Sequence, residues 1–170
     1  MNFSPILFSI SYGVMTMVTE QDVLNRWNEI QSDSEKILFI VGGPGSGKSS
    51  IIRSLASDQK WEYIEAKELL SEELLEVARD QRPEVVRQMI LENLEAIDSP
   101  VVCLDSVDVL FTPILNLDAI ALLRELSQMF PLVVGWKGRY AGESLHLEHN
   151  NDPEYFVHAI EEPNHVLCVG

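Results

Sequence analysis

The chain has 170 residues, enough for one domain with a sizeable core, and its 46% hydrophobic content argues against disorder. Twelve basic residues against 27 acidic ones give a formal charge of −15, and a surface of that sign repels nucleic acid and anionic membranes. We therefore expect no membrane association and no direct binding of nucleic acid by this chain alone, while contact with DNA through a basic partner protein stays open.

The first 17 residues, from Met1 to Met17, are apolar but are interrupted by polar and turn-forming residues. They lack the basic start of a signal peptide, and they are too short and too polar to span a bilayer. Two interpretations stay open for residues 1–17. They form an N-terminal arm that packs on the core or on a partner, or they are an extension that follows from start-codon choice.

A helix, a strand and a second helix are predicted next. Thr19 has the character of an N-cap, and apolar residues recur after it at helical spacing as far as Ile30. The apolar run 37–41 has the length of a buried strand, and it leads directly into a glycine-rich loop and a helix that begins near Ser50. Strand, loop and helix in this order are the context in which such a loop binds phosphate.

Strands and helices alternate in the rest of the chain. Helical periodicity predicts two helices over residues 69–97, with a break at Arg82-Pro83, and another helix over residues 117–129. Short apolar runs predict strands at 61–64, 101–104, 132–136 and 166–169. The segment 137–165 is rich in Gly, Asn, Asp and His, and we expect it to be a long loop without regular structure.

Unbroken apolar strands separated by helices indicate a parallel sheet that helices cover on both faces. We therefore predict an α/β fold, a three-layer αβα P-loop NTPase formed by residues 18–170. Its five parallel strands, numbered in chain order, are expected in the order 5-1-4-3-2. Because the chain ends one residue after the fifth strand, we expect no lid domain.

The two cysteines both lie inside apolar runs. Cys103 belongs to the run 101–104 and Cys168 to the run 166–169. Both are expected to be small buried hydrophobic residues and not a disulfide or a metal-binding pair. This use of cysteine is typical of a reduced, cytoplasmic protein.

Residues 42–49 fit the phosphate-binding pattern G-x-x-x-x-G-K-[ST] at every position. The glycines let backbone N–H groups turn toward a β-phosphate, and the following helix presents the positive end of its dipole. Lys48 is expected to contact the β- and γ-phosphates, and Ser49 to supply a hydroxyl ligand to Mg²⁺. The residues expected to bind ATP are Gly42, Gly43, Pro44, Gly45, Ser46, Gly47, Lys48, Ser49 and Ser50.

Asp105 ends an apolar strand, which is the Walker B arrangement. The strand carries this carboxylate to the carboxyl edge of the sheet, where it is expected to hold the Mg²⁺ together with Ser49. Ser106 follows, so the Asp-Glu pair of vigorous ATPases is missing. Asp108 is either a residue near the attacking water, as in the Walker B of signal-transducing ATPases that Asp105-Ser106-Val107-Asp108 resembles, or an ordinary helix N-cap.

Two cations follow the fourth predicted strand. Lys137 and Arg139 lie at the edge of the sheet that faces the γ-phosphate in nucleotide-binding folds. Arg139 is the stronger candidate for a catalytic role, because its guanidinium group matches phosphate oxygens. It is expected to sense the γ-phosphate or to reach a neighbouring subunit as an arginine finger. A salt bridge on the acidic surface is the alternative.

The order of segments over residues 18–170 resembles BrxF, the small P-loop protein of some BREX bacteriophage-defence systems. The phosphate-binding loop alone is shared by a very large superfamily, and its combination with the Trp-x-Gly-Arg-Tyr block makes the resemblance specific. The segments that carry it are 42–49, 82–83, 101–111, 136–140 and 152–155. The resemblance implies a nucleotide-binding component of a multiprotein DNA-targeting complex, with other BREX proteins, including a larger ATPase, as partners.

We therefore expect a protein that binds ATP with Mg²⁺ and hydrolyses it slowly or only within an assembly, with ATP-dependent self-association. A catalytically inactive nucleotide-binding scaffold is the main alternative, because an acid is missing at Ser106. A small-molecule kinase would need a cationic lid, for which only Lys137 and Arg139 are available. A GTPase is disfavoured, since Asp108 occupies the glycine position of its Asp-x-x-Gly signal.

Overall fold

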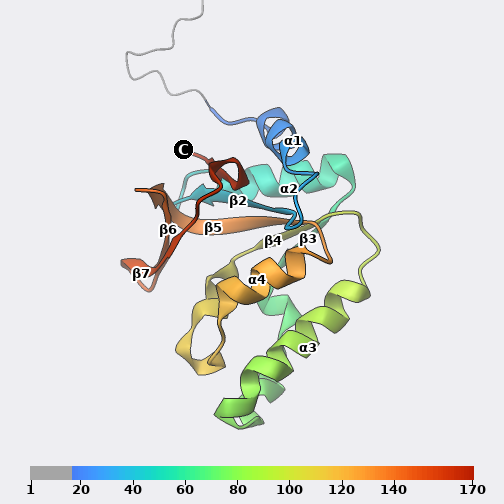
Figure 1. Cartoon of the computed structure of the whole chain (residues 1–170), viewed down its shortest axis with the longest axis vertical. Helices are drawn as coiled ribbons and strands as arrows, with labels where there is room; N and C mark the ends of the chain where they lie inside the picture. Colours follow the sequence, from blue (N-terminus) through green and yellow to red (C-terminus); the bar gives the residue numbers. More distant parts are fainter. Residues whose placement is uncertain (1–16) are drawn as a thin grey trace, which may run out of the picture.

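A central sheet with helices on both faces organises the protein (Figure 1). The structure, a computed structural model, describes residues 17–170. The strands are β2 (Ile37–Gly42), β3 (Glu62–Glu65), β4 (Val102–Asp105), β5 (Leu132–Ala141), β6 (Ser144–His149), β7 (Asp152–Ala159) and β8 (Val166–Cys168). The α-helices are α1 (Glu20–Glu29), α2 (Lys48–Gln59), α3 (Arg82–Glu95) and α4 (Ala119–Ser127). The 3₁₀ helices are η1 (Ala66–Leu69), η2 (Glu72–Glu76), η3 (Arg79–Gln81), η4 (Val107–Phe111), η5 (Pro113–Leu115) and η6 (Pro163–His165).

Five strands run parallel in the order β3-β4-β5-β2-β8. These strands correspond to the five that were predicted, and read from the other edge their order is 5-1-4-3-2. The prediction of the parallel sheet and of its order is therefore confirmed. The arrangement places the loop after β2 and the end of β4 at the same edge of the sheet.

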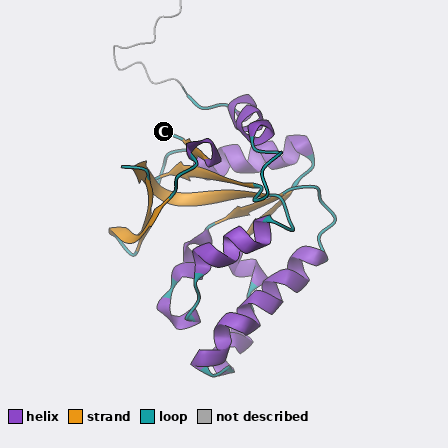
Figure 2. Ribbon diagram, viewed as in Figure 1, coloured by secondary structure: helices purple, strands orange, loops and turns teal. Residues whose placement is uncertain are grey.

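The alternation of side chains along β2 separates two hydrophobic layers. Leu38 and Ile40 pack with α1 and α2 on one face, while Phe39 and its neighbours pack with α3 and α4 on the other. Figure 2 shows these helix pairs on opposite sides of the strands. Thr19 caps α1, because its hydroxyl accepts from the Asp22 N–H and the Asp22 carboxylate accepts from the Thr19 N–H. The predicted N-cap is thus confirmed.

The two predicted helices over residues 69–97 are only half correct. α3 begins at Arg82 with Pro83 in its first turn, as expected. The segment before it forms the short 3₁₀ helices η1, η2 and η3 instead of an α-helix. The acidic stretch offers little apolar surface, since Ala66, Leu69 and Leu74 are the buried residues of its three 3₁₀ helices. An α-helix there would have no continuous face to bury.

The prediction of an irregular loop over residues 137–165 is wrong. β5 continues as far as Ala141, and β6 and β7 form an antiparallel hairpin on it. Both connections are two residues long with positive φ, at Gly142-Glu143 and at Asn150-Asn151. Such two-residue turns match the twist of a hairpin. Leu145 and Leu147 of β6 are fully buried, which gives the hairpin its own apolar face.

Two further predictions concern the cysteines and residues 1–17. Cys103 is buried as predicted, but Cys168 is exposed, because it ends the short edge strand β8. The expected arm at residues 1–17 lies outside the described residues except for Met17, whose side chain is exposed.

Candidate nucleotide-binding site

The loop between β2 and α2 forms a pocket of about 370 Å³. Gly47 adopts a left-handed conformation with φ of 89°, and α2 begins at Lys48 without a side-chain cap. The first N–H groups of a helix have no partner within the helix, so a phosphate can accept from them here. The pocket is lined by Gly43, Pro44, Gly45, Ser46, Gly47, Lys48, Ser49, Ser50, Ser106, Asp108 and Lys137. The sequence-predicted loop residues, apart from buried Gly42, therefore face one pocket.

Asp105 is the last residue of β4, at the same edge of the sheet as the loop, and its side chain is 1% exposed. Its Oδ1 is 3.1 Å from the Lys48 ammonium and accepts from the Ser106 N–H at 2.9 Å. Its Oδ2 accepts from the Tyr63 hydroxyl at 2.7 Å. The Lys48 ammonium is also 3.5 Å from the Ser49 hydroxyl, so the cation, the hydroxyl and the carboxylate of the predicted site are brought together.

These contacts keep Asp105 ionised despite its burial. Burial raises the pKa of its carboxyl group, but hydrogen bonds from Tyr63 and Ser49 and the charge of Lys48 outweigh it, so the pKa lies below its ordinary value of 3.8. The same environment shifts the pKa of Tyr63 in the opposite direction. Burial, followed by its hydrogen bond to Asp105, raises the pKa of Tyr63 well above 10.0. The pair is thus a neutral phenol that donates to a carboxylate.

Gly135 of β5 makes room for the Asp105 side chain. A Cβ atom at this position would lie 2.2 Å from Asp105 Oδ1 and 3.1 Å from the Ile52 side chain. Such a distance to a buried carboxylate is impossible without displacing it. The glycine inside an otherwise apolar strand is therefore explained by the close approach of Asp105.

The donor set at this edge suits a hard divalent cation. The carboxylate of Asp105 and the hydroxyl of Ser49 are oxygen ligands of the kind that Mg²⁺ accepts, together with water and phosphate oxygens. Both residues lie beside the pocket into which phosphates would fit. Ser49 and Asp105 would hold the Mg²⁺, which would supply charge neutralisation to the phosphates.

The remaining predicted residues divide into two groups. Asp108, in η4, and Lys137, in β5, line the phosphate pocket. Arg139 does not line it and instead pairs with Glu154 of β7 at 2.6 Å, with side chains 47% and 56% exposed. The salt bridge on the acidic surface, foreseen as the alternative for Arg139, is therefore what the structure shows within one chain.

A second, more apolar pocket of about 430 Å³ adjoins the loop. It shares Ser46, Gly47 and Ser50 with the phosphate pocket. Its other lining residues come from the start of α1, from α2 and from the last residues of the chain, and they are Met17, Val18, Thr19, Glu20, Ile51, Ser54, Val169 and Gly170. A pocket of this size and position can receive the base and sugar of a nucleotide whose phosphates lie on the loop.

Sequence reasoning missed two polar residues of this edge. Tyr63 bonds to Asp105, and His149 bonds through Nδ1 to Asp108 Oδ2 at 2.9 Å. The position of Tyr63 follows from the predicted sheet order, because β3 is the neighbour of β4. His149 had no comparable signal, since its strand was expected to be a loop.

The sequence model described as "ATPase family associated with various cellular activities (AAA)" matches residues 37–117, just under half of the chain. The match runs from β2 past η5. It includes the loop, Asp105 and Asp108, and it ends before Lys137 and the hairpin.

Two curated relatives are similar over a short stretch. The replication factor C large subunit of Methanocella arvoryzae is 43% identical over 42 residues, which are 25% of this chain and 8% of that protein. The replication factor C large subunit of Haloarcula marismortui is 38% identical over 45 residues, 26% of this chain and 9% of that protein. The chain thus matches less than a tenth of the length of these relatives.

No helix among residues 17–170 has the length and apolar character needed to cross a membrane. The sheet order, the loop that precedes α2 and the match over residues 37–117 all indicate the same fold. The protein has a P-loop NTPase fold, and its central region is similar to the AAA family.

Proposed function

We propose that this protein binds ATP with Mg²⁺ and hydrolyses it slowly, or only within an assembly, so that the nucleotide acts as an assembly or conformational switch. The observation that carries the proposal is the pocket in which the start of α2, Lys48, Ser49 and Asp108 face one another. Phosphates there would accept from the helix N–H groups and from Lys48, and the more apolar neighbouring pocket would take the nucleoside.

The switch follows from the contact between Lys48 and Asp105. Both side chains are nearly buried, at 10% and 1% exposure, and each satisfies the other. A triphosphate would draw Lys48 away from Asp105, and the freed carboxylate oxygen would face the bound Mg²⁺. Binding therefore rearranges the carboxyl end of β4, from which η4 leads to the rest of the molecule.

The residues around the phosphate pocket favour slow hydrolysis. Ser106 occupies the position next to Asp105, so the glutamate of an Asp-Glu pair is missing there, and Asp108 is the carboxylate that lines the pocket. Lys48 and Lys137 are the cations that line the pocket. Phosphoryl transfer usually requires a further cation to balance the charge that develops in the transition state. A second molecule could supply it, which favours activity inside an assembly.

The setting we propose is a bacterial anti-phage complex of the BREX type. It rests on the resemblance to BrxF, and it would give the chain a larger ATPase among its partners. The relatives named replication factor C large subunit are consistent with a role as one component of a larger assembly. The charge of −15 suits a basic partner more than direct contact with nucleic acid.

One experiment tests the function itself. Purified protein is titrated with ATP, ADP and GTP in the presence and absence of Mg²⁺, and the mass of the species and the released phosphate are measured together. We expect Mg²⁺-dependent binding of ATP, slow phosphate release and an increase in mass. Tight binding without phosphate release at any protein concentration would favour the inactive scaffold, for which Ser106 beside Asp105 is the specific observation. Absence of binding would refute the proposal.

A further inference from the structure

The short helix η4 carries Asp108 from the end of β4 into the phosphate pocket. The Asp108 carboxylate is contacted from β6 by His149, whose Nδ1 lies 2.9 Å from Oδ2. The two side chains are 21% and 18% exposed, so this contact is largely shielded from water. Because a carboxylate oxygen accepts hydrogen bonds, we assign Nδ1 as the donor in this contact.

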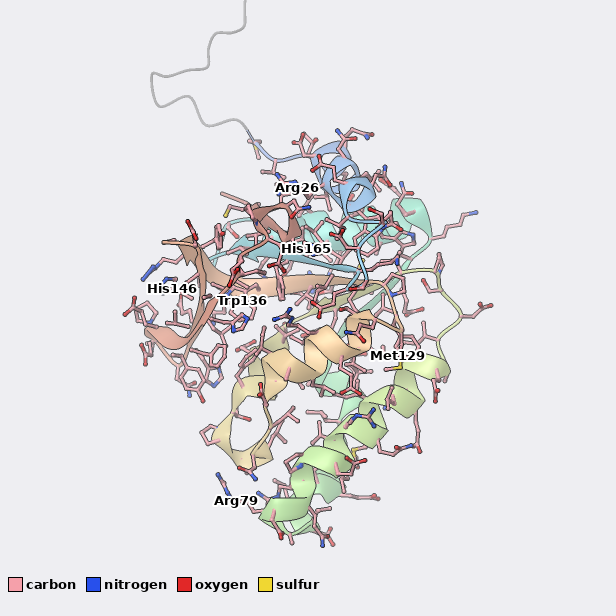
Figure 3. All side chains as sticks on the ribbon, viewed as in Figure 1. Arg26, Arg79, Met129, Trp136, His146 and His165 are labelled. Carbon is pink, nitrogen blue, oxygen red and sulfur yellow. The ribbon has the colours of Figure 1, made fainter. Side chains whose placement is uncertain are left out.

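The hairpin holds η4 at its other end as well. The Tyr155 hydroxyl of β7 donates to the Phe111 carbonyl at 3.2 Å. The Phe111 ring packs on Phe156 and on Trp136, with centroids 4.8 Å and 5.5 Å apart. The Trp136 indole donates in turn to the His146 carbonyl at 3.1 Å, and Figure 3 shows these two labelled residues close together where β5 meets the hairpin. Both ends of η4 are therefore attached to β6 and β7.

We propose that His149 is a positioning residue, which fixes the Asp108 carboxylate in the phosphate pocket and so makes the β6–β7 hairpin a determinant of hydrolysis. The His149 bond engages Oδ2 and leaves Oδ1 able to accept a hydrogen bond from a water beside the γ-phosphate. The same bond transmits motion, since any displacement of η4 on nucleotide binding pulls on β6. The inference rests on the proposed nucleotide function of the site.

The position of His149 allows its hydrogen bond to be separated from its packing. Its ring lies against Tyr155, with centroids 4.9 Å apart. His149→Phe keeps a ring against Tyr155 but loses the N–H donor. His149→Asn loses the ring but keeps an N–H donor on the atom next to Cγ, where Nδ1 stands in histidine. A role in packing alone would make the asparagine variant the poorer protein.

The test measures ATP affinity by calorimetry, kcat and KM by phosphate release, and Tm for the two variants. His149→Phe is expected to lower kcat by about tenfold, the value of a hydrogen bond to a charged group, while ATP affinity changes by less than about threefold. His149→Asn should keep most of kcat. His146→Asn is the matched control, because His146 lies in the same strand with its ring toward the Ala141 carbonyl and Glu154. It should leave kcat unchanged.

A double variant tests whether His149 acts through Asp108. Asp108→Ala combined with His149→Phe should be no slower than Asp108→Ala alone, because either change removes the hydrogen bond between the two side chains. Multiplying effects would contradict the inference, as would equal losses in His149→Phe and His149→Asn.

Hydrogen exchange provides a second measurement that does not require turnover. ATP should raise the protection of the amides over residues 144–157 in the unmodified protein but not in His149→Phe. ATP binding without any such protection would overturn the inference and leave the nucleotide function standing. Failure of the unmodified protein to bind ATP would instead refute the proposed function.

Discussion

Lys48 and Asp105 form an ion pair in which Lys48 Nζ lies 3.1 Å from Asp105 Oδ1. Lys48 is the cation that we assign to the phosphates, and Asp105 is the carboxylate that we assign to the metal ion. Asp105 has further donors, among them the Tyr63 hydroxyl and the Ser106 N–H. When the Lys48 ammonium moves to a phosphate, the buried Asp105 carboxylate therefore still has hydrogen-bond donors. The free energy of binding has to include this exchange of partners.

Lys48→Ala should lower the affinity for ATP by about ten- to one-hundredfold, as expected for the loss of charge-assisted hydrogen bonds to phosphate. The fold should persist, because Asp105 keeps its bonds to Tyr63 and Ser106. Isothermal titration measures the affinity, and circular dichroism measures the fold. Lys67→Ala, at an exposed lysine of η1, is the control. Unchanged ATP affinity in Lys48→Ala would contradict the assignment of Lys48 to the phosphates.

Asp105→Ala should reduce Mg²⁺-dependent ATP binding more than Asp108→Ala does. Asp105 is the proposed metal ligand, whereas Asp108 lines the pocket and bonds to His149. Asp108→Ala should instead lower kcat with little change in affinity. Titrations with ATP at several Mg²⁺ concentrations separate the two effects. A larger loss of Mg²⁺-dependent affinity in Asp108→Ala would reverse the assigned roles.

Tyr63→Phe should destabilise the protein by about 1–3 kcal/mol near neutral pH, since it removes a hydrogen bond to a buried charge. The ring and its contact with Arg53, whose guanidinium carbon lies 5.0 Å from the ring centroid, are kept. The variant should also bind Mg²⁺–ATP more weakly, because the Asp105 carboxylate loses one of the contacts that orient it. Chemical unfolding and ATP titration measure the two effects.

The difference in stability between Tyr63→Phe and the unmodified protein should depend on pH. The pKa of Asp105 is lowered in the folded state, so its contribution is present above about 3.8 and is lost as pH falls through the lower folded value. The pKa of Tyr63 is raised, so its contribution is present below 10.0 and is lost as pH rises through the folded value. The difference should therefore shrink below 3.8 and well above 10.0. A difference that is the same at every pH would argue against this pair.

The sequence predicted the parts of the site that depend on short segments. A loop between a strand and a helix, and an aspartate at the end of an apolar strand, are local patterns, and together they predicted that Lys48 and Asp105 belong to one site at the same edge of the sheet. Tyr63 could have been found too, because the predicted order places its strand next to that of Asp105. It was missed because a tyrosine in a strand usually indicates packing.

The hairpin shows where the sequence was misread. Leu145 and Leu147 alternate with polar residues, and Asn150-Asn151 suits a two-residue turn. The many polar residues of segment 137–165 concealed this pattern. The contact of His149 with Asp108 depends on how the hairpin folds back over η4, across 41 residues of sequence, and no local pattern carries that information.

Gly135→Ala should disable the site without removing any functional group. The added Cβ would meet Asp105 Oδ1 at 2.2 Å, so the carboxylate has to move away from Lys48 and Tyr63. We expect a loss of about 1–3 kcal/mol in stability, typical of overpacking, together with weaker Mg²⁺–ATP binding. Normal affinity in Gly135→Ala would mean that the placement of Asp105 is unimportant for binding.

Arg139 provides the test of self-association. Its ion pair with Glu154 is half exposed, and such surface pairs contribute only about 0–1 kcal/mol, so a phosphate from a neighbouring molecule can replace the carboxylate. Because Arg139 does not line the pocket of its own chain, we expect it to complete the site of a second molecule. The net charge of −15 opposes self-association, but this repulsion is screened at ordinary ionic strength.

Specific activity should therefore rise with protein concentration, and light scattering should show larger species with ATP than with ADP or without nucleotide. Arg139→Ala should lose the dependence on concentration and keep ATP affinity within about threefold, because its side chain contributes nothing to the pocket that binds the phosphates. Mixing Arg139→Ala with Lys48→Ala gives the decisive comparison. If Arg139 acts between molecules, the mixture regains activity that neither variant has alone, since an intact pocket then meets an intact arginine. A mixture as inactive as its parts, with a monomer under all conditions, would mean that the cation acts within one chain or comes from another protein.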